Sequence, residues 1–153
     1  MRRIVMDSIK DILKFAIDRE EEAANFYSHL AEKAKFAGLK SVLKEFEREE
    51  WGHKKKLEQI SAGAQAMPLL AKINDLKIAD YTIPVKIAPD MSYQDILIVA
   101  MKREKASFRL YTDLASRAAD TNIQGIFKHL AQEEAKHKLR FETEYDAYIM
   151  AEN

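Results

Sequence analysis

The same spacing of charged and aromatic residues occurs twice in this chain, at a constant offset of 84 positions. Residues 12–60 align with residues 96–144 without a gap, and 15 of the 49 aligned positions are identical. In each copy a tyrosine and an E-x-x-H motif follow a glutamate. The matched residues are Glu20 and Glu104, Tyr27 and Tyr111, Glu50 and Glu134, and His53 and His137. Because shared helical composition would supply roughly a few identities, the sequence predicts two copies of one helical unit.

Each copy shows the apolar periodicity of two helices. In the first copy, apolar residues at steps of three and four run from Ile12 to Ala34 and again from Val42 to Ile60. Gly38 lies between these two stripes, and Asn122 occupies the matching position in the second copy. Glycine and asparagine tolerate the left-handed conformation that ends many helices. We therefore expect four helices of roughly 25 residues, with left-handed helix ends at Gly38 and Asn122.

The segment between the two copies predicts a long connection. It contains all three prolines of the chain, Pro68, Pro84 and Pro89. We expect a helical hairpin at about 8–61, a crossover at about 62–90 and a second hairpin at about 91–148. At ~3.3 Å per residue, such a crossover could run the length of a helical bundle. Two hairpins joined in this way are typical of a ferritin-like four-helix bundle, so we expect one all-α domain over residues 1–153.

The repeated glutamates occupy positions in the apolar stripes where leucine or phenylalanine would be expected. Burial of a carboxylate costs several kcal/mol unless the carboxylate is paired or bound to a metal. Each E-x-x-H motif also places a carboxylate and an imidazole on adjacent turns of one helix face. The charge of four carboxylates matches two divalent cations. The sequence therefore predicts a dinuclear metal site with the ligands Glu20, Glu50, His53, Glu104, Glu134 and His137.

The proportion of carboxylates indicates which metal the site would take. One imidazole and several carboxylates per ion suit iron or manganese, whereas zinc usually has fewer carboxylate ligands. We expect two iron ions, with manganese as the alternative. The remaining histidines, His29 and His129, have no counterpart in the repeat, and we expect them on the surface.

Two further pairs of repeated residues lie close to the predicted ligands. Tyr27 and Tyr111 follow the first glutamates by two turns, so that their hydroxyls could donate hydrogen bonds to a ligand carboxylate. The alternative is a core tyrosine whose hydroxyl bonds another group. Glu49 and Glu133 directly precede the E-x-x-H motifs and either orient the histidines or face solvent.

Composition argues against several other classes of protein. Lys+Arg and Asp+Glu both number 25, so no global basic charge attracts nucleic acid or acidic membranes. The absence of cysteine excludes disulfides, iron–sulfur clusters and a cysteine nucleophile. No signal-peptide pattern is present, and the longest apolar run, residues 96–101, is too short to span a bilayer. We expect a cytoplasmic protein that binds neither nucleic acid nor membranes.

These residues resemble the ferritin-like diiron-carboxylate superfamily, and within it the rubrerythrin-like proteins. The resemblance extends from about residue 8 to about residue 148. Its most specific parts are the segments EEEAANFYSHLAE and REKASFRLYTDLA and the motifs EEWGH and EEAKH. It implies that Glu20 and Glu104 are terminal or bridging ligands, that the two E-x-x-H pairs supply the others, and that Tyr27 and Tyr111 support them.

The resemblance also implies a function. Members typically reduce hydrogen peroxide or oxidise ferrous iron, and many are dimers. We expect an oxidoreductase acting on hydrogen peroxide or dioxygen, an external electron-donor protein, and a homodimer or larger homo-oligomer. The alternatives are a ferroxidase or iron-storage protein, in which iron is the substrate, and a structural module with an idle site.

Two departures from the family pattern weaken the specific prediction of peroxidase activity. Rubrerythrins proper have a four-cysteine rubredoxin domain, and this sequence has no cysteine. Many also have an extra glutamate one turn from the ligand on the third helix. The residues one turn from Glu104 are Ala100, Met101, Ser107 and Phe108. The predicted metal site is unaffected by either departure.

Overall fold

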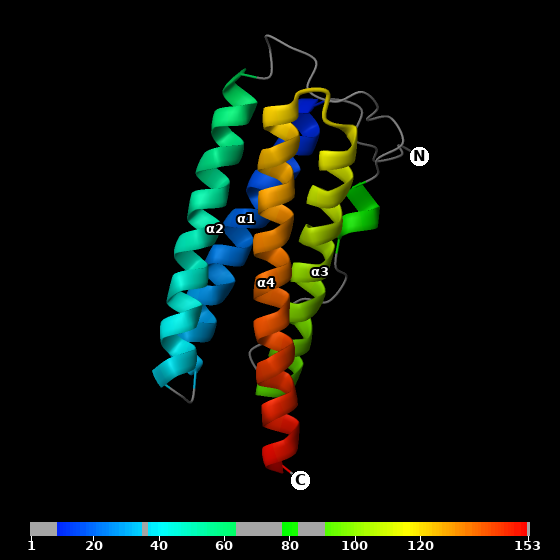
Figure 1. Ribbon diagram of the computed structural model, residues 1–153. Coiled ribbons are helices and arrows are strands. Elements are labelled where there is room, and N and C mark those ends of the chain that lie inside the picture. Colours follow the sequence, from blue (N-terminus) through cyan, green and yellow to red (C-terminus); the bar gives the residue numbers. More distant parts are fainter. Residues whose placement is uncertain (1–8, 35–36, 64–77, 83–90, 153) are drawn as a thin grey trace, which may run out of the picture. The chain divides into compact units, whose positions relative to one another are not determined.

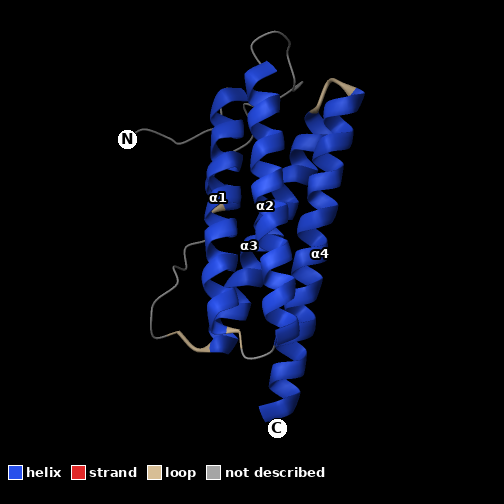
Figure 2. Ribbon diagram, turned by 90° about the vertical axis from the view of Figure 1, so that its left-hand side faces the viewer, coloured by secondary structure: helices blue, strands red, loops and turns tan. Residues whose placement is uncertain are grey.

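The computed structural model describes residues 9–34, 37–63, 78–82 and 91–152. Their elements are four long α-helices and one short 3-10 helix, η1 (Figure 1). The bounds are α1 Ile9–Lys33, α2 Ala37–Gly63, η1 Ile78–Tyr81, α3 Tyr93–Arg117 and α4 Thr121–Glu152. No strand occurs among the described residues, as Figure 2 shows, so the all-α prediction is confirmed.

The helix bounds follow the sequence repeat. The helix α3 begins and ends 84 positions after α1, and α4 begins 84 positions after α2. The end of α4 at Glu152 lies beyond the position that matches the end of α2, and beyond the end expected near residue 148. The repeated unit is therefore a helical hairpin.

The two hairpins belong to two compact units, 1–78 and 79–153. In the first unit α1 packs against α2, and in the second α3 packs against α4. Apolar residues at helical spacing are buried at matched positions of both units. These pairs are Ile12 and Ile96, Leu13 and Leu97, Ala16 and Ala100, Leu30 and Leu114, Leu43 and Phe127, Phe46 and Leu130, and Leu57 and Phe141. Burial of these side chains supplies the main stabilisation of each hairpin.

The expected left-handed helix ends at Gly38 and Asn122 were wrong. Both residues lie in the first turn of the following helix, and no described residue has a positive φ. The helix α3 ends earlier, at Arg117, and Ala118 has an extended backbone. Neither hairpin therefore uses the predicted residue to end its first helix.

An N-cap explains where α4 begins. The Asp120 side chain accepts a hydrogen bond from the Asn122 backbone N–H at 2.7 Å, and the Asp120 carbonyl accepts one from the Gln124 N–H at 2.9 Å. Aspartate in this position satisfies backbone donors that the first turn leaves unbonded. The start of α4 is therefore fixed by Asp120, two residues before the expected break.

The predicted crossover is described only in part. Residues 62–63 belong to α2, and η1 with Thr82 lies later in the segment. The buried Tyr81 donates a hydrogen bond to Asp113 of α3 at 2.5 Å. Burial, followed by the contact with Asp113, raises the pKa of the Tyr81 hydroxyl. This contact attaches η1 to α3. The three prolines and the expected path of the crossover lie outside the described residues.

We predict that Asp120→Ala lowers the free energy of unfolding by about 1 kcal/mol, because it removes the side-chain acceptor at the start of α4. The control is Asn122→Ala, which keeps the backbone N–H that Asp120 bonds, and we expect it to change stability by only a few tenths of a kcal/mol. Chemical denaturation followed by circular dichroism measures both variants. Equal losses in the two would contradict the cap.

Candidate metal centre

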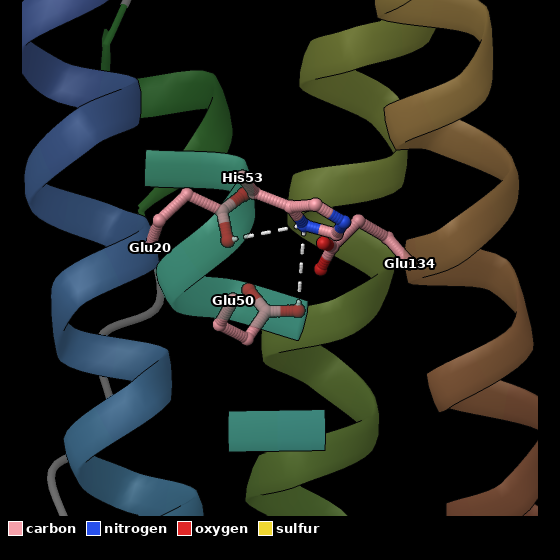
Figure 3. A group of neighbouring side chains, drawn as sticks. All are labelled: Glu20, Glu50, His53 and Glu134. Atoms are coloured by element: carbon pink, nitrogen blue, oxygen red, sulfur yellow. Dashed lines mark ion pairs between the residues drawn. The ribbon is translucent and has the colours of Figure 1, made fainter. Parts of the chain in front are cut away.

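The first unit brings three of the predicted ligands together. Glu20 projects from α1, and Glu50 and His53 project from adjacent turns of α2; all three are buried. The Nδ1 atom of His53 lies 3.5 Å from Glu20 Oε2 and 3.7 Å from Glu50 Oε1. Figure 3 shows both carboxylates turned toward the imidazole. One imidazole nitrogen therefore faces two carboxylates on two helices.

The second unit repeats this arrangement with Glu104 of α3 and with Glu134 and His137 of α4. All three side chains are buried, and His137 Nδ1 lies 3.7 Å from Glu104 Oε2. In each unit the three residues each offer one ligand atom, and these atoms lie within 4.8 Å of one another. Each hairpin therefore holds two carboxylates and one imidazole in one small volume.

Local sequence explains how the long glutamate side chains are accommodated. Alanine occurs one turn before each first glutamate, as Ala16 before Glu20 and Ala100 before Glu104, and both alanines have no exposed surface. Residues four apart are neighbours on a helix surface. A small residue at this position leaves space in the core, which the longer glutamate beside it can enter.

The chemistry of these donors fits iron or manganese. Two carboxylates and one imidazole form a hard oxygen and nitrogen set, and their burial requires a compensating positive charge. The distances of 3.5–3.7 Å between imidazole nitrogen and carboxylate oxygen exceed the roughly 2.7–2.9 Å of a charge-assisted hydrogen bond. The separation of these groups is compatible with their binding a common ion.

Both repeated tyrosines are core residues. Tyr27 lies with its ring centroid 5.6 Å from that of Phe26 and 6.0 Å from that of Phe46. Tyr111 stacks on Phe127 at 6.4 Å. Both tyrosines are buried. Their rings are therefore fixed by aromatic packing, and the donation of their hydroxyls to ligand carboxylates stays a prediction.

Glu133 is half-buried and contacts two residues of α4, and its role stays a prediction. Its carboxylate lies 3.7 Å from His129 Nε2 and 3.4 Å from Lys136 Nζ, and both of these partners are exposed. His29 is exposed as well, so the two histidines without a repeat partner lie on the surface, as expected. The role of Glu49, which is half-buried, stays a prediction.

Reasoning from residue types did not predict an ion pair that lies next to the first ligand set. Lys54 Nζ lies 3.7 Å from Glu21 Oε1, and these residues directly follow His53 and Glu20. In the second unit the equivalent of Glu21 is Lys105, and Lys138 instead pairs with Glu142 at 2.6 Å. The alignment of the two copies contains one sign of this difference, because the acidic Glu21 of the first copy aligns with the basic Lys105 of the second.

Comparison with known proteins identifies relatives of this arrangement. The model of the family described as Rubrerythrin matches residues 11–145. No curated protein has a matching sequence. In the described part of the chain, no helix combines the length and apolar character that a membrane span requires.

Two solved structures are similar over nearly their whole length. The first, from Thermotoga maritima, is provisionally named a ferritin-like diiron-carboxylate protein. Its TM-score is 0.77 and its sequence identity is 22%. The match covers 95% of this chain and 98% of that one. The second is a hypothetical protein from Pyrococcus furiosus, with a TM-score of 0.69 and 26% identity, covering 92% of this chain and 89% of that one. The predicted ferritin-like four-helix-bundle fold is confirmed by these matches.

We predict that Glu50→Ala abolishes binding of one metal ion or both, because it removes a carboxylate that offsets the charge of the cation. The fold should survive, since the variant also loses a buried charge. Glu45→Ala, an exposed change on the same helix, is the control and should bind metal like the wild type. Elemental analysis after metal loading and desalting measures the stoichiometry. Retention of two ions per chain by Glu50→Ala would refute the ligand assignment.

We also predict that Glu20→Gln combined with Glu104→Gln stabilises the metal-free protein, because one buried negative charge disappears from each hairpin. A thermal midpoint higher by about 2–4 °C is the shift that ~1 kcal/mol gives in a chain of this size. Ferrous or manganous ions should raise the midpoint of the wild type but not that of the variant. Glu22→Gln, on the exposed face of α1, should behave like the wild type. A wild-type midpoint that metal leaves unmoved would refute the site.

Proposed function

Because the chain belongs to the rubrerythrin family, we propose that it is a non-haem diiron oxidoreductase that reduces hydrogen peroxide or dioxygen. One observation carries the proposal: the same buried set of two glutamates and one histidine occurs in both helical hairpins. A bound metal ion would compensate the negative charge of each buried set. Two such sets could therefore bind two ions. We propose that the two sets together hold a pair of iron ions.

Each group of the ligand set has a separate task in this proposal. The four carboxylates would balance the positive charge of two iron ions. The imidazoles of His53 and His137 would each supply one nitrogen donor. When bound, a ferrous pair supplies the two electrons that, with two protons, convert one hydrogen peroxide molecule into two water molecules.

The surrounding core protects this chemistry. Apolar and aromatic side chains, among them Tyr27, Phe46, Tyr111 and Phe127, are buried in the two hairpins. Exclusion of bulk water strengthens the interaction between carboxylates and cations and limits side reactions. We propose that the hydroxyls of Tyr27 and Tyr111 hold ligand carboxylates in place by donating hydrogen bonds.

Repeated turnover requires an electron source outside this sequence. The 153 residues contain no cysteine, so they cannot form an iron–sulfur or rubredoxin-type site. We therefore propose that a separate electron-donor protein re-reduces the iron after each reaction.

The decisive experiment compares two oxidants and follows the fate of the iron. Protein loaded with ferrous iron is mixed with hydrogen peroxide or dioxygen in a stopped-flow instrument, reduced again with dithionite, and cycled. We expect oxidation by peroxide to be faster than by dioxygen, and the iron content to stay at about two per chain, as a resident cofactor requires. Glu134→Ala is the negative control.

Two outcomes would contradict this function. Comparable rates with the two oxidants, or a faster reaction with dioxygen, would refute peroxide as the preferred oxidant. Accumulation of iron well beyond two per chain in a large hollow assembly would identify iron as the substrate, and the protein as a ferroxidase or store.

A further inference from the structure

Trp51 and Gly52 are unusual residues for the exposed surface of a helix such as α2. Trp51 is the single tryptophan of the chain and is 36% exposed, and Gly52 is exposed beside it. Glycine in a helix interior destabilises the helix relative to alanine. A Cβ at Gly52 would meet no atom within 4 Å, so packing within the described chain does not require glycine there. At the matched positions α4 has Ala135 and Lys136, which are ordinary residues for an exposed helix.

The Trp51 ring is held in place at the surface. Its Nε1–H donates a hydrogen bond to Glu47 Oε2 at 3.2 Å. The ammonium of Lys54 lies 5.4 Å from the ring centroid, within the range of a cation–π interaction. Lys54 is itself paired with Glu21 of α1. An exposed tryptophan whose orientation is already fixed loses little entropy when a partner covers it, which is typical of interface anchors.

The helix face around Trp51 is basic. We define the Trp51 face as the residues of α2 that share this side of the helix: Lys40, Lys44, Glu47, Arg48, Trp51, Lys54, Lys55 and Glu58. Five of them are cationic and two are anionic, although the chain as a whole is balanced at 25 and 25. Among the described residues, no ion pair is found for Lys44, Arg48 or Lys55. The matched residues of α4 include only two cationic side chains, Lys128 and Lys138.

We propose that the Trp51 face binds an acidic one-electron carrier protein, which re-reduces the oxidised iron; this inference rests on the proposed function. The positive charge of the face favours encounter with an acidic surface. Gly52 lets the backbone of a partner approach closely. Trp51 directly follows Glu50 in the chain, so the docking residue and a candidate metal ligand are carried by the same turn of α2.

The electron balance of this step is simple. A reduced carrier gives up one electron and becomes oxidised, and one ferric ion becomes ferrous. Two such transfers restore the ferrous pair for each molecule of peroxide reduced. Trp51 is the contact residue through which the carrier is seated.

Binding is tested with two carriers of opposite charge, an acidic plant-type ferredoxin and basic cytochrome c. Isothermal titration of the iron-loaded protein at low salt should show binding of the ferredoxin and not of cytochrome c. Lys44→Glu should weaken ferredoxin binding by about tenfold, the effect of reversing a charge that faces the partner. The matched change on α4, Lys128→Glu, should alter it by less than about twofold, because Lys128 does not belong to the Trp51 face. Added salt should weaken the wild-type complex.

Electron transfer is tested separately. Reduced ferredoxin should re-reduce the oxidised iron about tenfold more slowly in Trp51→Ala than in the wild type, because truncation of a central aromatic anchor weakens docking. Dithionite, which needs no docking surface, should reduce both proteins at the same rate. Consumption of peroxide by the dithionite-reduced protein reports on the proposed function alone, so failure of that function and failure of docking give different results. Circular dichroism confirms that each variant is folded.

Three results would overturn the inference. The first is equal weakening of ferredoxin binding by Lys44→Glu and Lys128→Glu. The second is binding of cytochrome c as tight as that of ferredoxin. The third is a native dimer that Trp51→Ala converts to a monomer, which would identify the occupant of the Trp51 face as a second copy of this chain.

Discussion

The burial of two carboxylates beside one imidazole in each hairpin is the constraint on which the rest of the structure depends. Anions removed from water destabilise a folded protein by several kcal/mol unless positive charge compensates them. Long helices suit this task because their backbone polar groups are bonded within the helix. In the described part of the chain, the buried carboxylate and imidazole side chains are those of the six candidate ligands. Alanine beside Glu20 and Glu104, and aromatic residues around Tyr27 and Tyr111, complete a core that accepts the charged groups at fixed positions.

Most of the fold and the candidate ligands could be predicted because the constraint is visible in the sequence. A single glutamate in an apolar stripe carries little information. Glu20 and Glu50, however, each recur 84 positions later, again within an apolar stripe. Helix starts follow the same offset. The residues at which the chain turns between paired helices could not be predicted in this way, because a local cap decides them: Asp120 fixes the start of α4, whereas Asn122 merely aligned with Gly38. The bond from Tyr81 to Asp113 joins residues far apart in the chain and has no periodic signal.

The two hairpins keep identical ligands but have different surfaces. Lys54 pairs with Glu21 across α1 and α2, whereas Lys105 and Lys138 occupy the equivalent positions of the second hairpin. Trp51 and Gly52 likewise have no counterpart in α4. The proposed metal pair needs the same donors in both halves, which agrees with the repeat of the candidate ligands. A partner protein needs only one docking surface. The proposed surface around Trp51 accordingly occurs in the first hairpin and has no counterpart in the second.

We propose that the two sets of candidate ligands hold one pair of iron ions. Mössbauer and electron paramagnetic resonance spectroscopy of the iron-loaded, oxidised protein test it most directly, because two ferric ions that share ligands couple their spins. The account predicts two irons per chain in a coupled pair that gives no paramagnetic resonance signal at low temperature. Isolated high-spin ferric ions, each with its own signal and independent of the other, would contradict it.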